Sequence, residues 1–133
     1  MEILALPRRA LSIRQPWAEL ILGGQKTLEI RSRPTKVRGW VQIYAALRRE
    51  DGPWQLRAAA EHGLDLDTLQ RGWLLGVAEI VGCRRVTPAD SRQACFEIPS
   101  DQELYGWELA NSRRHQVPRK PSGQPQPSFF FVE

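Results

Sequence analysis

Residues 11–18, Leu-Ser-Ile-Arg-Gln-Pro-Trp-Ala, and residues 24–31, Gly-Gln-Lys-Thr-Leu-Glu-Ile-Arg, decide how the start of this chain folds. The alternation of apolar and polar residues at positions 11–13 predicts a short strand. Pro16 suits the first turn of a helix, and Trp17, Leu20 and Ile21 then follow at helical spacing. Gly23 and Gly24 predict the end of this helix, because glycine enters the left-handed conformation without penalty.

A second alternating segment, residues 27–31, predicts a strand with two different faces. Leu28 and Ile30 share one face, whereas Glu29 and Arg31 lie side by side on the other, where the arginine can keep the carboxylate ionised. Strict alternation puts Lys26 on the opposite face, so it can join them only from the glycine turn ahead of the strand. Spacing alone leaves three interpretations open: a phosphate-binding site, a lysine that takes part in hydrolysis, and an ordinary solvated charge pair. It favours the charge pair.

The rest of the chain continues this pattern of short elements. Further strands are predicted at residues 40–46, 72–81, 105–109 and 128–133, and helical segments at residues 54–62 and 65–70. A polar connection is expected at residues 87–102 and an ordered or semi-ordered loop at residues 111–126. We expect residues 1–10 to be a loose arm and residues 11–133 a single domain. About six strands, two or three short helices and no βαβ alternation predict an α+β domain built on a small mixed β-barrel.

Composition narrows the class of partner. The formal net charge is +4, and of the 19 basic residues only Lys26, Lys36 and Lys120 are lysine. Arginine binds phosphate bidentately and stacks on bases, which favours nucleic acid, although the codon bias of a GC-rich genome explains the same excess equally well. Two cysteines twelve positions apart, with two histidines, predict free thiols and neither a metal site nor a cofactor. The sequence has no recognisable secretory signal or membrane span, so a cytoplasmic location without a membrane partner is expected.

Several segments together resemble the ASCH domain family (activating signal cointegrator homology), whose fold is a PUA-like β-barrel. The resemblance rests first on residues 11–18 and on the pattern Gly24-x-Lys26-x-x-Glu29-x-Arg31. Residues 38–46, 74–79 and 105–109 resemble three of the family's strands, so the similarity extends from about residue 11 to residue 132. It implies an RNA-binding or RNA-processing module in which Lys26, Glu29 and Arg31 line a cleft between the barrel and its helices.

The resemblance also implies two possible activities. Some small bacterial members of the family remove the acetyl group from N4-acetylcytidine, and ribonuclease activity is associated with the family as well. The deacetylating type uses a lysine that matches Lys26, a threonine at the position of Glu29 and a more distant glutamate. Here Lys26 carries over, Glu29 replaces the threonine, and the sequence does not identify the distant glutamate.

We therefore predict an RNA-binding ASCH module whose cleft accepts an unstacked base or a modified nucleoside. The alternative is a hydrolase, either an amidohydrolase acting on an N-acylated cytidine or a weak ribonuclease, with Lys26 and Glu29 as candidate catalytic residues. A protein-interaction adaptor, suggested by the prolines of residues 118–127, ranks last. Trp17 fits a core role better than a stacking role. The candidate nucleic-acid-binding residues are Arg14, Gln15, Trp17, Lys26, Arg31, Arg33, Lys36, Arg38, Tyr105, Trp107, Arg113 and Arg114.

Overall fold

The computed structural model describes residues 5–132 and confirms the α+β class with six strands and three short α-helices in that part of the chain. Most elements are short, as the frequent glycines and prolines predict. In chain order they are β1 (Arg9–Ile13), α1 (Trp17–Leu22), β2 (Leu28–Arg31), β3 (Gly39–Ala45), α2 (Pro53–Glu61), β4 (Trp73–Arg85), the 3-10 turn η1 (Pro88–Asp90), α3 (Ser91–Ala94), β5 (Tyr105–Arg119) and β6 (Phe129–Phe131).

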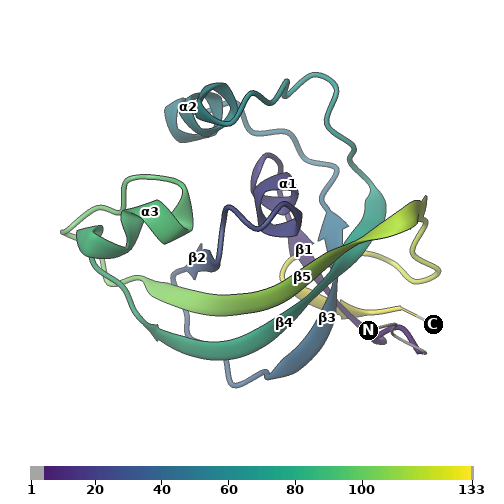
Figure 1. Ribbon diagram of the computed structural model, residues 1–133. Coiled ribbons are helices and arrows are strands. Elements are labelled where there is room, and N and C mark those ends of the chain that lie inside the picture. The colour runs from purple at the N-terminus through teal and green to yellow at the C-terminus, as the bar shows by residue number, and fades with distance from the viewer. Residues whose placement is uncertain (1–4, 133) are drawn as a thin grey trace.

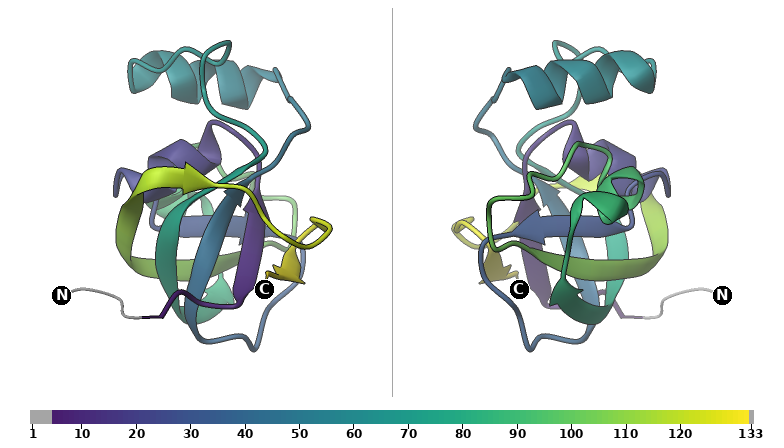
Figure 2. Two further views of the ribbon diagram at one scale, coloured as in Figure 1. Left: turned by 90° about the vertical axis from the view of Figure 1, so that its right-hand side faces the viewer. Right: turned by 90° about the vertical axis from the view of Figure 1, so that its left-hand side faces the viewer.

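The strands form one curled sheet with the order β2-β5-β4-β3-β1-β6. Neighbouring strands run antiparallel, except for β1 and β3, which are parallel. The long strands β4 and β5 bend around the core, while α1 and α2 lie above one end of the sheet with α2 outermost (Figures 1 and 2). The mixed barrel-like fold is thus confirmed as a half-barrel whose edges are β2 and β6.

The main core fills the concave side of this sheet. Leu11 and Ile13 of β1 pack with Val41 and Ile43 of β3 and with further apolar residues of β4 and β5. α1 closes the open end of the half-barrel, because Ala18 and Ile21 are completely buried against the same cluster. The helix ends as expected, at Gly23, and Gly24 follows with φ +84°, a conformation that glycine adopts readily.

The C-terminal part of the sheet differs from the expectation. The sequence predicted a strand at residues 105–109 and a loop at residues 111–126, but β5 continues to Arg119 and only the rest of that segment is irregular. Val77 pairs with Arg113 whereas Glu79 pairs with Ala110, so β5 carries an extra residue there, and Asn111 has φ +56°. Such a β-bulge interrupts the period of two on which the prediction depended.

Two further boundaries also differ. The expected polar connection at residues 87–102 contains η1 and α3, and Ala94 and Ile98 are buried against Leu28 of β2. β1 begins at Arg9 and Ala10 is fully buried, so the end of the expected arm belongs to the domain. The first four residues of that arm, and the last residue of the predicted strand at 128–133, lie outside the described residues.

Candidate functional site

A cavity of about 640 Å³ opens beside the edge of the half-barrel, where β2 approaches the end of β1. Its wall combines segments that are far apart in the sequence: β1 and β2, the residues that follow β3, and the loop before β6. The lining residues are Ser12, Arg14, Trp17, Glu29, Arg31, Tyr44, Ala46, Leu47, Arg48, Glu50, Gln124, Pro125, Gln126, Pro127 and Ser128. The volume lies in the range of roughly 300–1,000 Å³ that is typical of small-molecule sites.

Glu29 and Arg31 share the face of β2 that points into this cavity, as the strand period predicted. Arg31 Nε donates to Glu29 Oε2 at 2.8 Å, and its Nη2 donates to the carbonyl oxygen of Ser12 at 3.0 Å. The guanidinium of Arg31 also lies 5.1 Å from the ring centroid of Trp107. Arg31 therefore connects β2 to β1 through its side chain and holds the Glu29 carboxylate in one orientation.

Lys26 lies behind the cavity wall and is 2% exposed. Its Nζ donates to the carbonyl oxygen of Ala94 at 2.6 Å and is 3.9 Å from Glu29 Oε1, so the lysine joins Glu29 from the turn before β2. Its ammonium group lies over the rings of Trp17 and Phe96, at 4.8 and 5.4 Å from their centroids. Burial lowers the pKa of Lys26, and the negative charge of Glu29 opposes this shift.

The three aromatic candidates have different positions. Trp17 is half-buried and lines the cavity, whereas Trp107 is buried, stacks on Phe129 with a centroid distance of 5.3 Å, and has Arg31 near its ring. Its Nε1 donates to the carbonyl oxygen of Arg33 at 2.9 Å. Trp107 therefore packs the edge of the sheet. Tyr105 is outside the cavity lining, and its hydroxyl donates to Glu103.

The structure brings together only some of the predicted polar residues. Arg14 lines the cavity, but Gln15 is buried, and its Nε2 donates to the carbonyl oxygen of Gln70. Exposed residues between β2 and β3, and on the far part of β5, are outside the lining; these are Arg33, Lys36, Arg38, Arg113 and Arg114. Arg114 forms an ion pair with Glu19 of α1. The cavity thus unites Arg14, Trp17, Glu29 and Arg31, with Lys26 behind them.

Sequence reasoning missed other parts of the wall. Glu50 forms an ion pair with Arg14, and Ser12, Tyr44 and residues 124–128 complete the lining. The carbonyl of Ser12 is held by Arg31, and burial raises the pKa of Tyr44. The charged run at residues 48–51 was the only sequence signal near Glu50, and it predicted merely a solvated turn.

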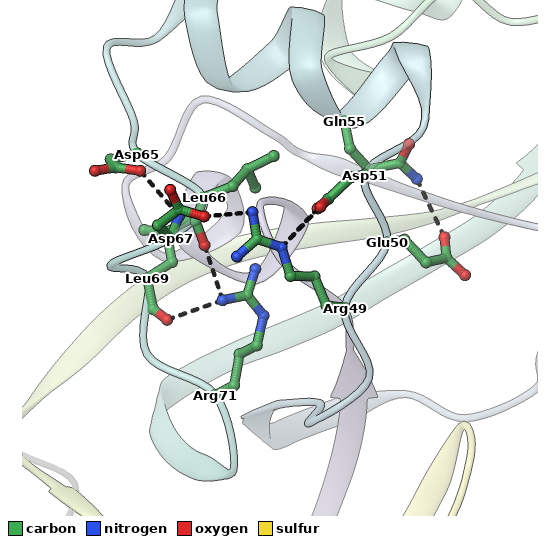
Figure 3. Close-up of polar contacts among 9 residues, drawn as sticks. All are labelled: Arg49, Glu50, Asp51, Gln55, Asp65, Leu66, Asp67, Leu69 and Arg71. Atoms are coloured by element: carbon green, nitrogen blue, oxygen red, sulfur yellow. Dashed lines mark hydrogen bonds and ion pairs between the residues drawn. The ribbon is translucent and has the colours of Figure 1, made fainter.

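The two chain segments that flank α2 are tied together by a polar network (Figure 3). Arg49 donates to Asp51 at 2.8 Å and forms a 2.6 Å ion pair with Asp67, so it bridges the segment before the helix and the segment after it. Arg71 donates to the carbonyl oxygens of Leu66 and Leu69. The network orders the stretch that carries Arg48 and Glu50 to the rim of the cavity.

Neither a metal site nor a membrane span stands out in residues 5–132. No group of three potential metal ligands occurs among these residues, and Cys83 and Cys95 are free thiols. None of the helices in this part of the chain has the length and apolar character needed to cross a membrane.

The fold and the cavity define a class: a small α+β half-barrel with a polar and aromatic site beside its open edge. The sequence profile of the ASCH domain matches residues 11–119, and the chain belongs to the ASCH domain family. The sequence matches no curated protein at a significant level.

Solved structures agree with this fold. The crystal structure of an ASCH protein from Zymomonas mobilis superposes with a TM-score of 0.60 at 16% sequence identity, covering 94% of this chain and 87% of that one. A single-substitution variant of that protein superposes at 0.59 with 16% identity, covering 94% and 89% of the two chains. A second variant superposes at 0.59 with 15% identity, covering 94% and 87%. At this level of identity the similarity defines the fold alone.

Proposed function

We propose that this ASCH domain binds single-stranded RNA and accepts one unstacked base or modified nucleoside in the cavity beside β2. The observation that supports this most strongly is the convergence of Arg14, Trp17 and the Arg31-oriented Glu29 on one cavity. An RNA ligand also agrees with the cytoplasmic location expected from the sequence.

Each of these side chains matches one property of a nucleotide. The half-buried ring of Trp17 offers a surface on which a base can stack. Glu29 is an oriented hydrogen-bond acceptor suited to the exocyclic amino group of a base such as cytosine. Arg14, with 40% of its side chain exposed, is placed to exchange its partner Glu50 for a phosphate.

Arginine 14 provides the sharpest test, because it lines the cavity without holding the sheet together. Arg14→Ala should weaken binding of short single-stranded RNAs by about 10- to 100-fold, as expected for a hydrogen bond to a charged group. Arg85→Ala is the matched control, since this exposed arginine of β4 lies outside the lining and is not among the candidate nucleic-acid-binding residues. Affinities come from titration calorimetry at constant salt. Equal affinities for wild type and Arg14→Ala would argue against the cavity as the binding site.

A hydrolytic function is the second candidate, and one observation favours it. Burial lowers the pKa of Lys26, and its Nζ lies 3.9 Å from the carboxylate of Glu29, a candidate acid–base group in the cavity wall. The substrate is then an N-acylated cytidine or the RNA backbone. Glu50 is the second carboxylate in the cavity wall, and it takes the place of the more distant glutamate in this scheme.

The hydrolytic candidate predicts turnover of N4-acetylcytidine or of short RNAs by the purified protein. Lys26→Met should abolish product formation while the protein still unfolds cooperatively. Chromatography of the nucleosides detects free cytidine, and denaturing gels detect RNA cleavage. If the protein binds RNA but forms no product, the hydrolytic function is refuted and the binding function stands.

A further inference from the structure

A second cavity, of about 410 Å³, lies between α2 and α3. Its principal side chains are aromatic or charged, and half-buried Trp54 and Phe96 provide the ring surfaces. Arg57, Glu61, Arg92 and Glu97 surround these rings. Phe96 packs against the small core cluster around Leu28, whereas Trp54 and the four charged side chains belong to none of the core clusters. Packing of the half-barrel therefore accounts for Phe96 but not for the grouping of the other five side chains around it.

A row of three aromatic rings joins this second cavity to the first. Trp17, in the wall of the first cavity, lies 5.6 Å from Phe96 between ring centroids. Phe96 in turn lies 6.1 Å from Trp54, and both rings line the second cavity. The two cavities are thus separated by one ring contact, with Lys26 buried beneath Trp17 and Phe96. An RNA chain that leaves the first cavity beside Trp17 would therefore reach the second cavity next.

The charges of the second cavity suit a nucleotide better than a purely apolar ligand. The guanidinium of Arg57 lies 5.2 Å from the ring centroid of Trp54, so a positive charge is held beside an aromatic surface. Arg92 is exposed on the opposite wall. These arginines can contact a phosphate, while Glu61 and Glu97 offer acceptors for the N–H groups of a base.

We infer that the cavity between α2 and α3 is a second nucleotide subsite, which takes the neighbour of the nucleotide bound beside β2. This inference rests on the proposed RNA-binding function and adds that the domain reads two adjacent nucleotides. The second base stacks on Trp54, and its phosphate pairs with Arg57 and Arg92. Stacking on aromatic side chains tolerates every base, so this subsite contributes affinity more than sequence preference.

The experiment compares three ligands by titration calorimetry: cytidine 5′-monophosphate, the dinucleotide CpC, and a cytidine joined to an abasic ribose. CpC should bind about 5- to 150-fold more tightly than the abasic ligand, which is the range expected for one stacked base. The abasic ligand carries the same linking phosphate, so this ratio isolates the second base.

Substitutions show which side chains are responsible for the tighter binding of CpC. Trp54→Ala should remove the advantage of CpC and leave binding of cytidine 5′-monophosphate unchanged, with Trp40→Ala, at an exposed position of β3, as its control. Arg92→Ala, which removes an exposed side chain that the core does not need, should weaken CpC several-fold. Arg85→Ala is the control, because this exposed arginine of β4 lines neither cavity. The indole N–H signals of the five tryptophans give an independent readout. CpC should shift the Trp54 signal, and the monophosphate should shift that of Trp17 alone.

The outcomes separate the two proposals. If the monophosphate binds beside Trp17 but CpC binds no better than the abasic ligand, the second subsite is refuted and the proposed function stands. The same conclusion follows if CpC binds more tightly than the abasic ligand but neither Trp54→Ala nor Arg92→Ala reduces this difference in affinity. If no ligand shifts the Trp17 signal and Arg14→Ala has no effect, the proposed function itself is lost, and the second subsite with it.

Discussion

The ammonium group of Lys26 is buried beside the rings of Trp17 and Phe96, where solvent cannot stabilise its charge. Three features offset part of this desolvation: the hydrogen bond to Ala94, the attraction of Glu29 and the two ring faces. Arg31 acts in the opposite direction through its like charge. The net result is a lysine whose pKa lies below the usual value of 10.5.

A lowered pKa makes this residue a source of pH-dependent stability. Between the folded pKa of Lys26 and its unfolded value near 10.5, the unfolded chain binds more protons, so stability rises with pH. Below the folded pKa, both states are protonated and the full burial penalty is present. Lys26→Met lacks this contribution. The unfolding free energy of wild type minus that of the variant should therefore increase as pH rises, by at most about 1.4 kcal/mol per pH unit.

Urea denaturation of both proteins between neutral pH and the upper end of this window measures the effect. The remaining titrating groups occur in both chains, so the difference between the two profiles isolates Lys26. Parallel profiles across the window would mean that Lys26 titrates in the folded protein as it does in the unfolded chain, against the burial described here.

Among the elements, η1 and α3 together position the carbonyl group that Lys26 contacts. Thr87 caps this pair: its hydroxyl accepts from the backbone N–H of Ala89, and Asp90 accepts from the backbone N–H of Thr87 in return. Asp90 is further fixed by Arg84, whose hydrogen bond lowers the pKa of the carboxyl group. This reciprocal capping box sets the direction in which α3 leaves β4.

Removal of the cap should therefore weaken the wall behind the cavity. Thr87→Ala is expected to lower the free energy of unfolding by about 0.5–2 kcal/mol, the usual range for an N-cap substitution. Thr87→Ser keeps the hydroxyl and should remain close to wild type. Chemical denaturation measures both variants. Equal losses in the two would show that the methyl group of Thr87, and not its cap, stabilises this turn.

At the scale of the whole molecule, the half-barrel depends on a very short last strand. β6 pairs with β1 through three residues and covers one edge of the sheet. Phe130 is 5% exposed and packs edge-on against Tyr44 at a centroid distance of 5.4 Å, while Phe129 stacks on Trp107. The segment before this strand also forms part of the cavity wall, so its attachment matters for the site.

Neighbouring phenylalanines of β6 provide a matched pair of substitutions. Phe130→Ala should lower the free energy of unfolding by about 3–5 kcal/mol, because it removes a buried ring from a packed cluster. Phe131→Ala should cost about 1 kcal/mol or less, since this ring is 61% exposed and contacts Arg9 through a cation–π interaction. Thermal and urea unfolding compare the two. Similar losses would contradict the packing of β6 described here.

Local patterns in the sequence determined a good part of this architecture. The alternation in β2 placed Glu29 and Arg31 on one face, and the glycines after α1 ended the helix and brought Lys26 to Glu29. The motifs along residues 11–119 identified the family. These features are readable because a strand period or a glycine turn depends on residues that are adjacent in the chain.

The tertiary structure decided which side chains share the cavity. Glu50 and residues 124–128 complete its wall, whereas Trp107, a candidate for stacking, is buried under Phe129. Arg113 and Arg114 lie on the part of β5 that continues past a bulge, beyond the predicted end of this strand. Sequence periodicity states where a side chain points relative to its own strand. The curl and register of the sheet, which depend on contacts between distant segments, decide what it faces.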